Sequence, residues 1–217
     1  VESSTETPAS RADALRALAA VAPQAAAPLI ETHLIESPPI LRATARELLA
    51  GRDGQRAIPL LANSLASDVM EERQLAARAL AIVPDKAAGT ALVEALRQVM
   101  DQRYPADSRL DVVEAAKKRR EPEVAALVVK LFGSRAADDP LALFADSLEG
   151  GNAAVGRVIF FERTQVSCVR CHKIEGQGGD VGPDLTRISP DKTRKYLLEA
   201  VVVPNRAIAK NFETALV

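Results

Sequence analysis

Large aromatic side chains are scarce in this sequence. Tryptophan is absent, and phenylalanine, tyrosine and tryptophan together make up only 3% of the 217 residues. Alanine and leucine dominate instead, and this composition favours helices packed through small side chains over a sandwich of β-sheets. The sequence therefore predicts an all-α fold.

The sequence also lacks an excess of charge of one sign and any long apolar run. It has 28 lysine and arginine residues against 29 aspartate and glutamate residues, which gives a net charge of -1 and a pI near 6.2. A chain with this balance has no strong field to attract nucleic acid. Its apolar runs fall short of the roughly 20 residues that cross a bilayer. We therefore expect no nucleic-acid partner and no membrane span.

An initiator methionine and a charged-then-apolar leader are missing as well, since the sequence begins at Val1. This start is typical of a mature product or of a fragment of a longer protein. We therefore expect the compartment to be indicated by the chemistry of the chain rather than by a targeting segment.

Short helical patterns separated by proline and glycine fill the chain from about residue 8 to 134. Apolar residues recur at steps of three and four, as in Leu41, Ala45 and Leu48, which is the spacing of an amphipathic helix. The pattern predicts eight short helices, over residues 12–23, 25–34, 37–51, 55–65, 71–84, 89–100, 108–120 and 122–133.

These helices also form a repeat. The triplet PLI at 28–30 returns as PLL at 59–61 and as ALV at 91–93 and 126–128, at offsets of 31, 32 and 35 residues. A period in the thirties with two helices per unit is typical of an α-solenoid. The segment 1–137 resembles HEAT-type repeats in this respect, and a plain helical bundle is the alternative.

Three features of this half could suggest a binding role. A packed or surface position explains His33 better than a ligand role does. The basic run 117–120 ends a predicted helix, where cations interact well with the helix dipole, so we expect a solvated helix end. Met70 and Met100 fit core or groove filling. The first half is therefore expected to be a scaffold.

The composition changes after the segment GSRAADDP at 133–140, which we interpret as a linker. Lys and Arg remain balanced by Asp and Glu, but aromatic residues become concentrated. Five of the seven aromatic residues of the chain lie in the last 80 positions: Phe144, Phe160, Phe161, Tyr196 and Phe212. We place a second domain at 138–217 that needs large, flat apolar neighbours.

The second domain contains the pattern CxxCH. Cys168 and Cys171 are the only cysteines of the chain, and His172 follows directly. In c-type haem, two such thiols form thioethers with the vinyl groups, and the histidine binds the iron. A dithiol redox pair, half of a zinc site, a local disulfide and coincidence are the alternatives.

These alternatives are less well supported than haem attachment. Structural zinc needs about four ligands, and the chain has only two cysteines and two histidines. A thioredoxin-like pair follows a strand in a βαβ unit, and no strand pattern precedes Cys168. A disulfide between Cys168 and Cys171 would close almost no loop. The pattern therefore favours one covalently attached haem c.

The surroundings of this motif resemble class I cytochromes c. Upstream, Gly156 and Phe160 in AAVGRVIFFERTQVSCVRCH match the small residue and the aromatic residue that pack against the closing helix in that family. Downstream, GQGGDVGPDLTRI is similar to the loop beneath the haem. There Pro183 matches the proline whose carbonyl accepts the ring N–H of the ligating histidine, and Leu185 is assigned to the pocket.

The segment KTRKYLLEAVVVPNRAIAKNF at 192–212 resembles the later helix of these cytochromes. The resemblance implies that Tyr196 and Leu197 face the haem pocket and that Pro204 begins the distal loop. The match extends over about 65 residues in the same order. It implies a cytochrome c-like helical domain with His172 as the proximal iron ligand.

A narrower resemblance is to the haem-binding domain at the C-terminus of large secreted proteins of planctomycetes, verrucomicrobia and their relatives. In that family the domain often follows HEAT-like repeats, which is the order of the two halves here. A propeller-type dehydrogenase domain precedes the repeats in that family. The resemblance implies a periplasmic or secreted bacterial location. It also implies a redox partner protein or a fused dehydrogenase domain.

The pattern departs from class I cytochromes c at the sixth iron ligand. Those proteins usually supply a methionine after the position of Pro204, followed by a closing helix. This chain has no methionine after Met100 and ends at Val217. Counting nine residues past Pro204 reaches Glu213, beside Phe212, and neither side chain is a typical iron ligand.

Three arrangements of the sixth ligand remain open. The haem domain is incomplete at its C-terminus and the ligand lies beyond Val217, which is the arrangement we favour. Alternatively, the iron is five-coordinate or water-bound, which would suit a sensor or a peroxidase-like module. In the third arrangement Lys210 or His33 reaches the iron. The choice matters because the axial ligand shifts the potential of haem over about 0.8 V.

The predicted function is electron transfer through haem c, and a HEAT-type interaction scaffold without haem is the alternative. Four cations of the second domain could form a rim that guides a redox partner. A solvated helix face is the simpler interpretation of the same residues, which are Arg187, Lys192, Arg194 and Lys195.

Overall fold

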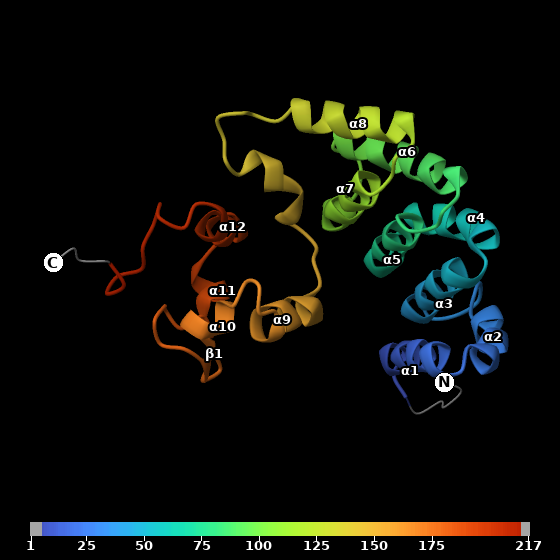
Figure 1. Ribbon diagram of the computed structural model, residues 1–217, viewed down its shortest axis with the longest axis horizontal. Helices are drawn as coiled ribbons and strands as arrows, with labels where there is room; N and C mark the ends of the chain where they lie inside the picture. The colour runs from blue at the N-terminus through green and yellow to red at the C-terminus, as the bar shows by residue number, and fades with distance from the viewer. Residues whose placement is uncertain (1–5, 214–217) are drawn as a thin grey trace. The chain divides into compact units, whose positions relative to one another are not determined.

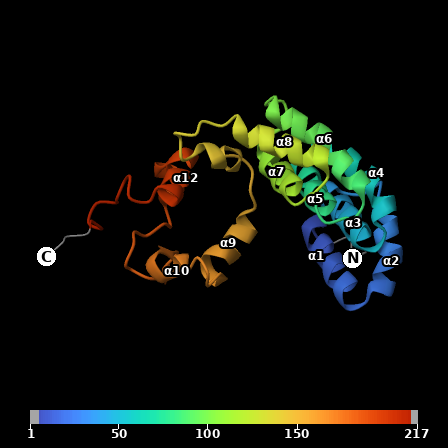
Figure 2. The same ribbon diagram turned by 45° about the horizontal axis from the view of Figure 1, so that its top comes forward.

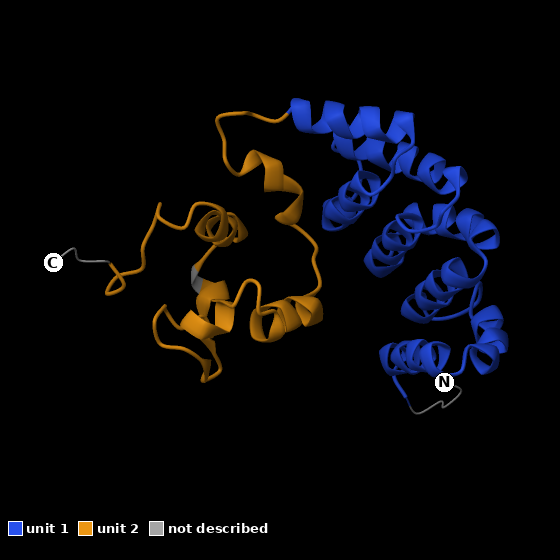
Figure 3. Ribbon diagram, viewed as in Figure 1, with its two compact units in different colours: residues 1–134 blue, residues 135–217 orange. Residues whose placement is uncertain are grey.

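The computed structural model describes residues 6–213, with the side chain of residue 191 left out. The described chain is mostly helical, as predicted. It divides into two compact units, Val1–Ser134 and Arg135–Val217 (Figure 3). The predicted boundary at 137/138 lies three residues later, and the outer ends of both predicted domains fall outside the described residues.

Unit 1 contains a helix at each of the eight predicted places. Proline begins four of the helices, where its missing N–H costs nothing. The side chains of Thr7, Asp53 and Asp85 each cap a helix by accepting a backbone N–H, and the helix capped by Thr7 is one of those that begin with proline. The helices are α1 (Pro8–Val21), α2 (Pro23–Thr32), α3 (Pro39–Arg52), α4 (Gly54–Leu65), α5 (Met70–Leu80), α6 (Lys86–Met100), α7 (Arg109–Lys117) and α8 (Pro122–Gly133), with a 3-10 turn η1 (Ala106–Ser108).

The helices of unit 1 stack in two layers. Each odd-numbered helix packs on the next odd-numbered one, from α1 through α3 and α5 to α7, and α4, α6 and α8 pack in the same way. Figures 1 and 2 show the odd-numbered layer on the inside of a curved row of helix pairs. One continuous apolar core runs between the layers, from Ala12 to Leu131.

Ion pairs join neighbouring helices of the odd-numbered layer at a regular spacing. Arg16 on α1 contacts Glu47 on α3 at 3.3 Å, 31 residues away. Arg42 on α3 contacts Glu72 on α5, 30 residues away, and Arg78 on α5 contacts Asp111 on α7, 33 residues away. The contacts therefore recur at nearly the spacing of the sequence repeat.

The basic run 117–120 differs from its predicted role as a solvated helix end. Helix α7 ends at Lys117, and the side chain of Arg119 is only 8% exposed. Its guanidinium donates to the carbonyls of Leu80, Val83 and Asp85 and pairs with Glu121. The prediction was wrong for Arg119, because its three carbonyl acceptors lie more than 30 residues away in sequence.

The other residues singled out in this half have packing roles. His33 follows α2 as its C-terminal cap, is 8% exposed, and places Nδ1 2.9 Å from the Ser37 hydroxyl. Met100 packs against the edge of the core. The prediction of a packed histidine is confirmed, and Met70 at the start of α5 is half-buried.

Unit 2 is built from short elements with little buried core. Leu141 is its buried hydrophobic residue among those that the structure describes. Arg135 lies within the predicted linker, and its guanidinium donates to the Ala142 and Leu143 carbonyls and pairs with the Asp146 carboxylate. The elements are η2 (Ala142–Ser147), α9 (Ala153–Glu162), α10 (Cys168–Cys171), β1 (Lys173–Ile174), β2 (Gln177–Gly178), α11 (Ile188–Asp191) and α12 (Arg194–Val202).

Between residues 6 and 213, none of the helices has the length and apolar character needed to cross a membrane.

Candidate functional site

The two cysteines lie on a single helical turn. Ser167 precedes it in the left-handed region, with φ 48°, so the chain enters the turn sharply. The turn closes where the His172 N–H donates to the Cys168 carbonyl at 3.0 Å. Residues three apart on a helix lie on neighbouring positions of one face, so both thiols are available to one flat partner. Neither cysteine is in a disulfide.

The ring of His172 is held by a backbone carbonyl. Its Nδ1 lies 2.9 Å from the Pro183 oxygen, and a hydrogen bond there puts the ring proton on Nδ1. The lone pair of Nε2 is then available for a metal. The contact with Pro183 therefore fixes the orientation of the imidazole and leaves Nε2 as the nitrogen that could bind a metal.

The loop can approach the ring this closely only because residue 182 is glycine. A Cβ atom at Gly182 would lie 2.6 Å from Cε1 and 2.8 Å from Nδ1 of His172. The Gly182 N–H donates to the Cys171 carbonyl at 2.7 Å. This bond ties the loop to the cysteine turn and brings Pro183 to the ring.

A two-stranded hairpin connects the cysteine turn to this loop. Strand β1 pairs with β2 antiparallel, and Glu175 and Gly176 form the turn with φ values of 52° and 77°. Two positive φ values are typical of a type I′ turn. At Gly178, with φ 126°, a Cβ would lie 2.1 Å from the His172 carbonyl oxygen. Glycine is therefore required at position 178, because a side chain there would collide with the backbone of His172.

Polar contacts fix the loop to the hairpin. The Asp184 carboxylate accepts from the backbone N–H and the hydroxyl of Thr186, and these bonds hold the pKa of Asp184 below its ordinary value. The Thr186 hydroxyl oxygen accepts from the Glu175 N–H at 2.8 Å. The ion pair of Lys173 with Asp180 raises the pKa of that lysine.

Phe160 lies on α9, which packs against the cysteine turn. Its ring meets that of Phe161 edge to face, with centroids 4.9 Å apart, and the Arg157 guanidinium lies 4.6 Å from the centre of the Phe161 ring. Phe160 is half-buried. The helix next to the cysteine turn therefore carries two aromatic rings that contact each other.

The remaining predicted pocket residues are less closely joined to the motif. Leu185 lies beyond Pro183 and donates its N–H to the Lys173 carbonyl at 2.9 Å. Tyr196 and Leu197 lie on α12 and are half-buried. Within residues 6–213, no hydrogen bond joins α12 to the cysteine turn or to His172. The structure thus brings Cys168, Cys171, His172 and Pro183 into one constellation.

Other ligands of a metal are not gathered in the described part of the chain. No group of three or more histidine, cysteine, aspartate and glutamate side chains is placed there to hold an ion. Lys210 and Glu213 are exposed in the segment after α12, and His33 belongs to unit 1. The region beyond Val217, where we expected the sixth ligand, is outside the described residues.

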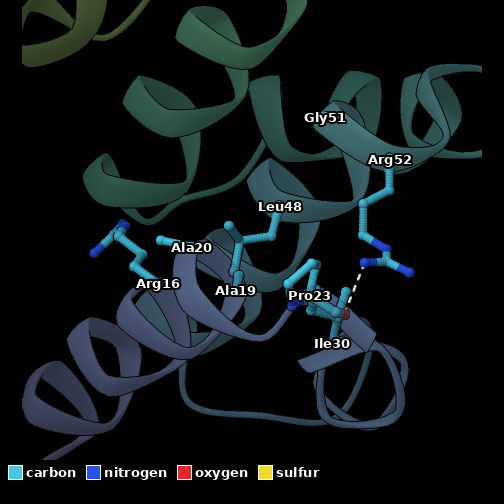
Figure 4. Close-up of a pocket in the computed structure, with 8 residues that line it drawn as sticks. All are labelled: Arg16, Ala19, Ala20, Pro23, Ile30, Leu48, Gly51 and Arg52. Carbon is cyan, nitrogen blue, oxygen red and sulfur yellow. Dashed lines mark hydrogen bonds between the residues drawn. The ribbon is translucent and has the colours of Figure 1, made fainter. Parts of the chain in front are cut away.

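Unit 1 has a hollow of about 290 Å³ between α1, α2 and α3 (Figure 4). Its two arginines already have partners. Arg52 donates to the Pro23 carbonyl at 2.8 Å, and Arg16 pairs with Asp13 and Glu47. The remaining lining is largely apolar, so the hollow offers little chemistry of its own.

Comparison of the chain with models of protein families, with curated proteins and with solved structures finds no match.

Two contacts of unit 2 were not predicted from the sequence. The resemblance predicted a loop at GQGGDVGPDLTRI but not the close approach of Gly182 to the ring of His172. Arg194 was interpreted as part of a solvated helix face, with a cationic rim as the alternative, and its exposed guanidinium also pairs with Glu149. The match of Pro183 to the carbonyl that holds the histidine was the signal for the approach of Gly182 to His172. No local pattern indicated the pair of Arg194 with Glu149.

Proposed function

We propose that unit 2 binds one haem c covalently and transfers electrons through it. The observation that carries the proposal is the set of two thiols on one turn, with the adjacent imidazole bonded through Nδ1 to the Pro183 carbonyl. This set supplies two attachment points and one iron ligand from five consecutive residues. The Pro183 contact would suit any metal-binding histidine. Haem is favoured over structural zinc because the sequence has only two cysteines and two histidines, and a dithiol redox pair makes no use of the imidazole.

Each residue has a separate task in this proposal. The thiols of Cys168 and Cys171 would each add to one vinyl group of haem, with the sulfur bonding one vinyl carbon and the thiol hydrogen going to the other, so two thioethers would form without an oxidant. His172 offers Nε2 to the iron, and Pro183 keeps the ring proton on Nδ1, which raises the basicity of the ligand. When bound, haem c supplies a one-electron couple between ferrous and ferric iron.

The apolar side chains of unit 2 support the presence of a large flat group. Val155, Val158 and Ile159 on α9 are 36 to 50% exposed, although they follow the i, i+3, i+4 spacing of a buried face. A folded domain normally buries such a face. A haem ring beside α9 offers apolar area of the required kind.

The repeat of contacts in unit 1 supports a HEAT-like α-solenoid as the scaffold. Helix pairs stack in sequence order, and ion pairs recur every 30 to 34 residues between successive pairs. In a solenoid each repeat contacts chiefly its neighbours. We propose that this unit holds the haem domain against a redox partner protein or a fused dehydrogenase domain.

Haem attachment by thioethers normally takes place outside the bacterial cytoplasm, so the proposal includes a periplasmic or secreted location. The test is an absorption spectrum of the full chain made in cells that attach haem c. The account predicts reversible ferrous and ferric spectra and a pyridine haemochrome typical of two thioethers. A colourless protein would leave a HEAT-type scaffold without haem as the function.

The same sample tests the sensor or peroxidase-like alternative. An iron with an open sixth position binds carbon monoxide in its ferrous state, and the spectrum then changes. A six-coordinate low-spin ferrous spectrum that carbon monoxide leaves unchanged would exclude that alternative and would support simple electron transfer.

A further inference from the structure

Two backbone hydrogen bonds join the glycine-rich loop to the segment that contains the histidine. The Gly182 N–H donates to the Cys171 carbonyl at 2.7 Å, and the Leu185 N–H donates to the Lys173 carbonyl at 2.9 Å. Both partners advance along the chain together from the first bond to the second. The loop therefore runs beside this segment in the same direction.

The contact of the His172 ring with the Pro183 carbonyl lies between these two bonds in sequence. Proline has no backbone N–H, so Pro183 cannot anchor itself to the segment through its own amide. The position of its carbonyl oxygen therefore depends on bonds that the residues on either side of it make.

A further bond beyond Pro183 uses a side chain of the loop. The Thr186 hydroxyl oxygen accepts from the Glu175 N–H at 2.8 Å. Glu175 begins the turn of the hairpin with φ 52°, a value that is uncommon for residues other than glycine. Of the four contacts between the two segments, this one can be removed by a single replacement that alters neither the cysteines nor the histidine.

Asp184 fixes the direction in which the Thr186 hydroxyl points. Its carboxylate accepts from the Thr186 N–H at 2.8 Å and lies 2.5 Å from the hydroxyl oxygen. These bonds hold the pKa of Asp184 below its ordinary value, so the carboxyl is ionised at neutral pH and can only accept. The hydroxyl therefore donates to Asp184, and its lone pairs face the Glu175 N–H.

We propose that Thr186 is a positioning residue for the candidate iron ligand. Its hydroxyl holds the end of the loop against the hairpin, so that the Pro183 carbonyl keeps the ring proton of His172 on Nδ1 and leaves Nε2 for a metal. The consequence for electron transfer rests on the proposed haem function, whereas the effect on the ring proton does not.

The test uses two replacements of Thr186 in the full chain. Thr186→Val keeps the shape of the side chain and removes the hydroxyl, and Thr186→Ser keeps the hydroxyl. Thr7→Val is the matched control, because the Thr7 hydroxyl also accepts a backbone N–H, in unit 1. Both threonines are exposed, so all three variants should fold, and circular dichroism checks this.

The first readout is the nitrogen NMR shifts of the two histidine rings in haem-free protein, at a pH where both rings are neutral. In Thr186→Val, the ratio of the Nδ1–H form to the Nε2–H form of His172 should fall about two- to tenfold, the factor that corresponds to the typical net strength of one hydrogen bond. Thr186→Ser and Thr7→Val should keep the wild-type ratio. The ring of His33 should be unchanged in every variant.

The second readout is the reduction potential of the haem-loaded protein. A weaker hydrogen bond from Nδ1 makes His172 a less basic ligand, which stabilises ferric iron less. The potential of Thr186→Val should therefore lie above that of wild type, and those of Thr186→Ser and Thr7→Val should equal it. Mere loosening of unit 2 would have the opposite sign, because water admitted to the haem stabilises ferric iron, which carries the higher charge.

The two proposals fail in different ways. If the wild-type protein takes up no haem, the proposed function is wrong, and the tautomer ratio alone decides the role of Thr186. If haem is attached but Thr186→Val keeps the wild-type tautomer ratio, or has a potential equal to or below that of wild type, Thr186 is not a positioning residue and the haem function stands. Equal changes in Thr186→Ser and Thr186→Val would also overturn the role of the hydroxyl.

Discussion

The ring of His172 and the backbone of Gly182 lie too close for any other residue at position 182. Replacement of Gly182 by alanine would put Cβ 2.6 Å from the ring, so either the loop or the ring must move. We predict that Gly182→Ala weakens the Pro183 contact and lowers the yield of haem-loaded protein. Overpacking of this kind costs about 1–3 kcal/mol.

Haem content per polypeptide, measured by absorbance, checks the Gly182→Ala prediction. Gly133→Ala is the matched control, because a Cβ at that position meets nothing within 4 Å, and its haem content should equal that of wild type. Equal haem content and an unchanged spectrum in Gly182→Ala would show that the close approach has no role.

The side chain of Arg119 joins the segment after α7 to the end of α5 and the residues that follow it. Its guanidinium satisfies the carbonyls of Leu80, Val83 and Asp85. Arg119→Met would keep the apolar stem but would leave these acceptors without their donor. We predict a loss of about 2–3 kcal/mol in the free energy of unfolding of unit 1.

Urea unfolding followed by circular dichroism measures this loss. The neighbour Arg120 is exposed, so Arg120→Met should change stability by no more than about 0.5 kcal/mol. Similar effects of the two replacements would contradict the assigned role of Arg119.

At the scale of elements, Glu72 joins α5 to α3 and makes unit 1 sensitive to acid. Burial opposes ionisation of this carboxyl, but hydrogen bonds from Arg42 and Ser67 and the charges of Arg42 and Arg46 outweigh it. The pKa of Glu72 therefore lies below its ordinary value of 4.5. A carboxylate with a lowered folded-state pKa stabilises the fold above the unfolded pKa, and this stabilisation is lost as the pH falls through the folded pKa.

We predict that Glu72→Gln destabilises unit 1 by about 1–3 kcal/mol at neutral pH. The variant should also lose less stability than wild type as the pH falls from 4.5 downward. Thermal unfolding at a series of pH values measures both effects. Glu71→Gln is the control, since Glu71 is exposed on the same turn, and parallel pH curves for wild type and Glu72→Gln would contradict the prediction.

The elements of unit 1 were predictable because apolar periodicity determines them locally. Each of the eight patterns corresponds to a helix, and six of the eight helices have proline or a capping side chain at their start. The buried position of Arg119 was not predictable, because a run of four basic residues carries no period and its carbonyl acceptors lie at the end of α5 and in the segment after it. The ion pair of Arg194 was not predictable either, because its partner, Glu149, is 45 residues away in sequence.

Only part of the candidate site was predictable from the sequence. The motif from Cys168 to His172 and the carbonyl of Pro183 follow from sequence spacing and resemblance, and the structure brings them together. The hairpin of β1 and β2 was not expected, because strands of two residues are too short to show alternation. The positions of Tyr196 and Leu197 relative to the motif depend on long-range contacts that sequence patterns do not report.

At the scale of the whole molecule, the two units differ in how their cores are built. Unit 1 has one continuous apolar core, whereas Leu141 is the buried hydrophobic residue among those described in unit 2. Covalently attached haem stays on the unfolded chain, so it stabilises unit 2 through the contacts that it makes only in the folded state. Attached haem should therefore raise the thermal stability of unit 2 far more than that of unit 1.

We predict two thermal transitions, of which only the one from unit 2 rises when haem is attached. Calorimetry of haem-loaded protein and of a variant with Cys168→Ala and Cys171→Ala provides the comparison. The unit 1 transition should coincide in the two samples. A single transition that shifts as a whole would show that the units do not unfold independently.

The most direct test of the account is the mass of the intact, denatured full chain made in cells that attach haem c. The account predicts the polypeptide mass plus one haem, and loss of the full two-thioether attachment in Cys168→Ala or Cys171→Ala. The polypeptide mass alone, 23.1 kDa for the sequence, would contradict it.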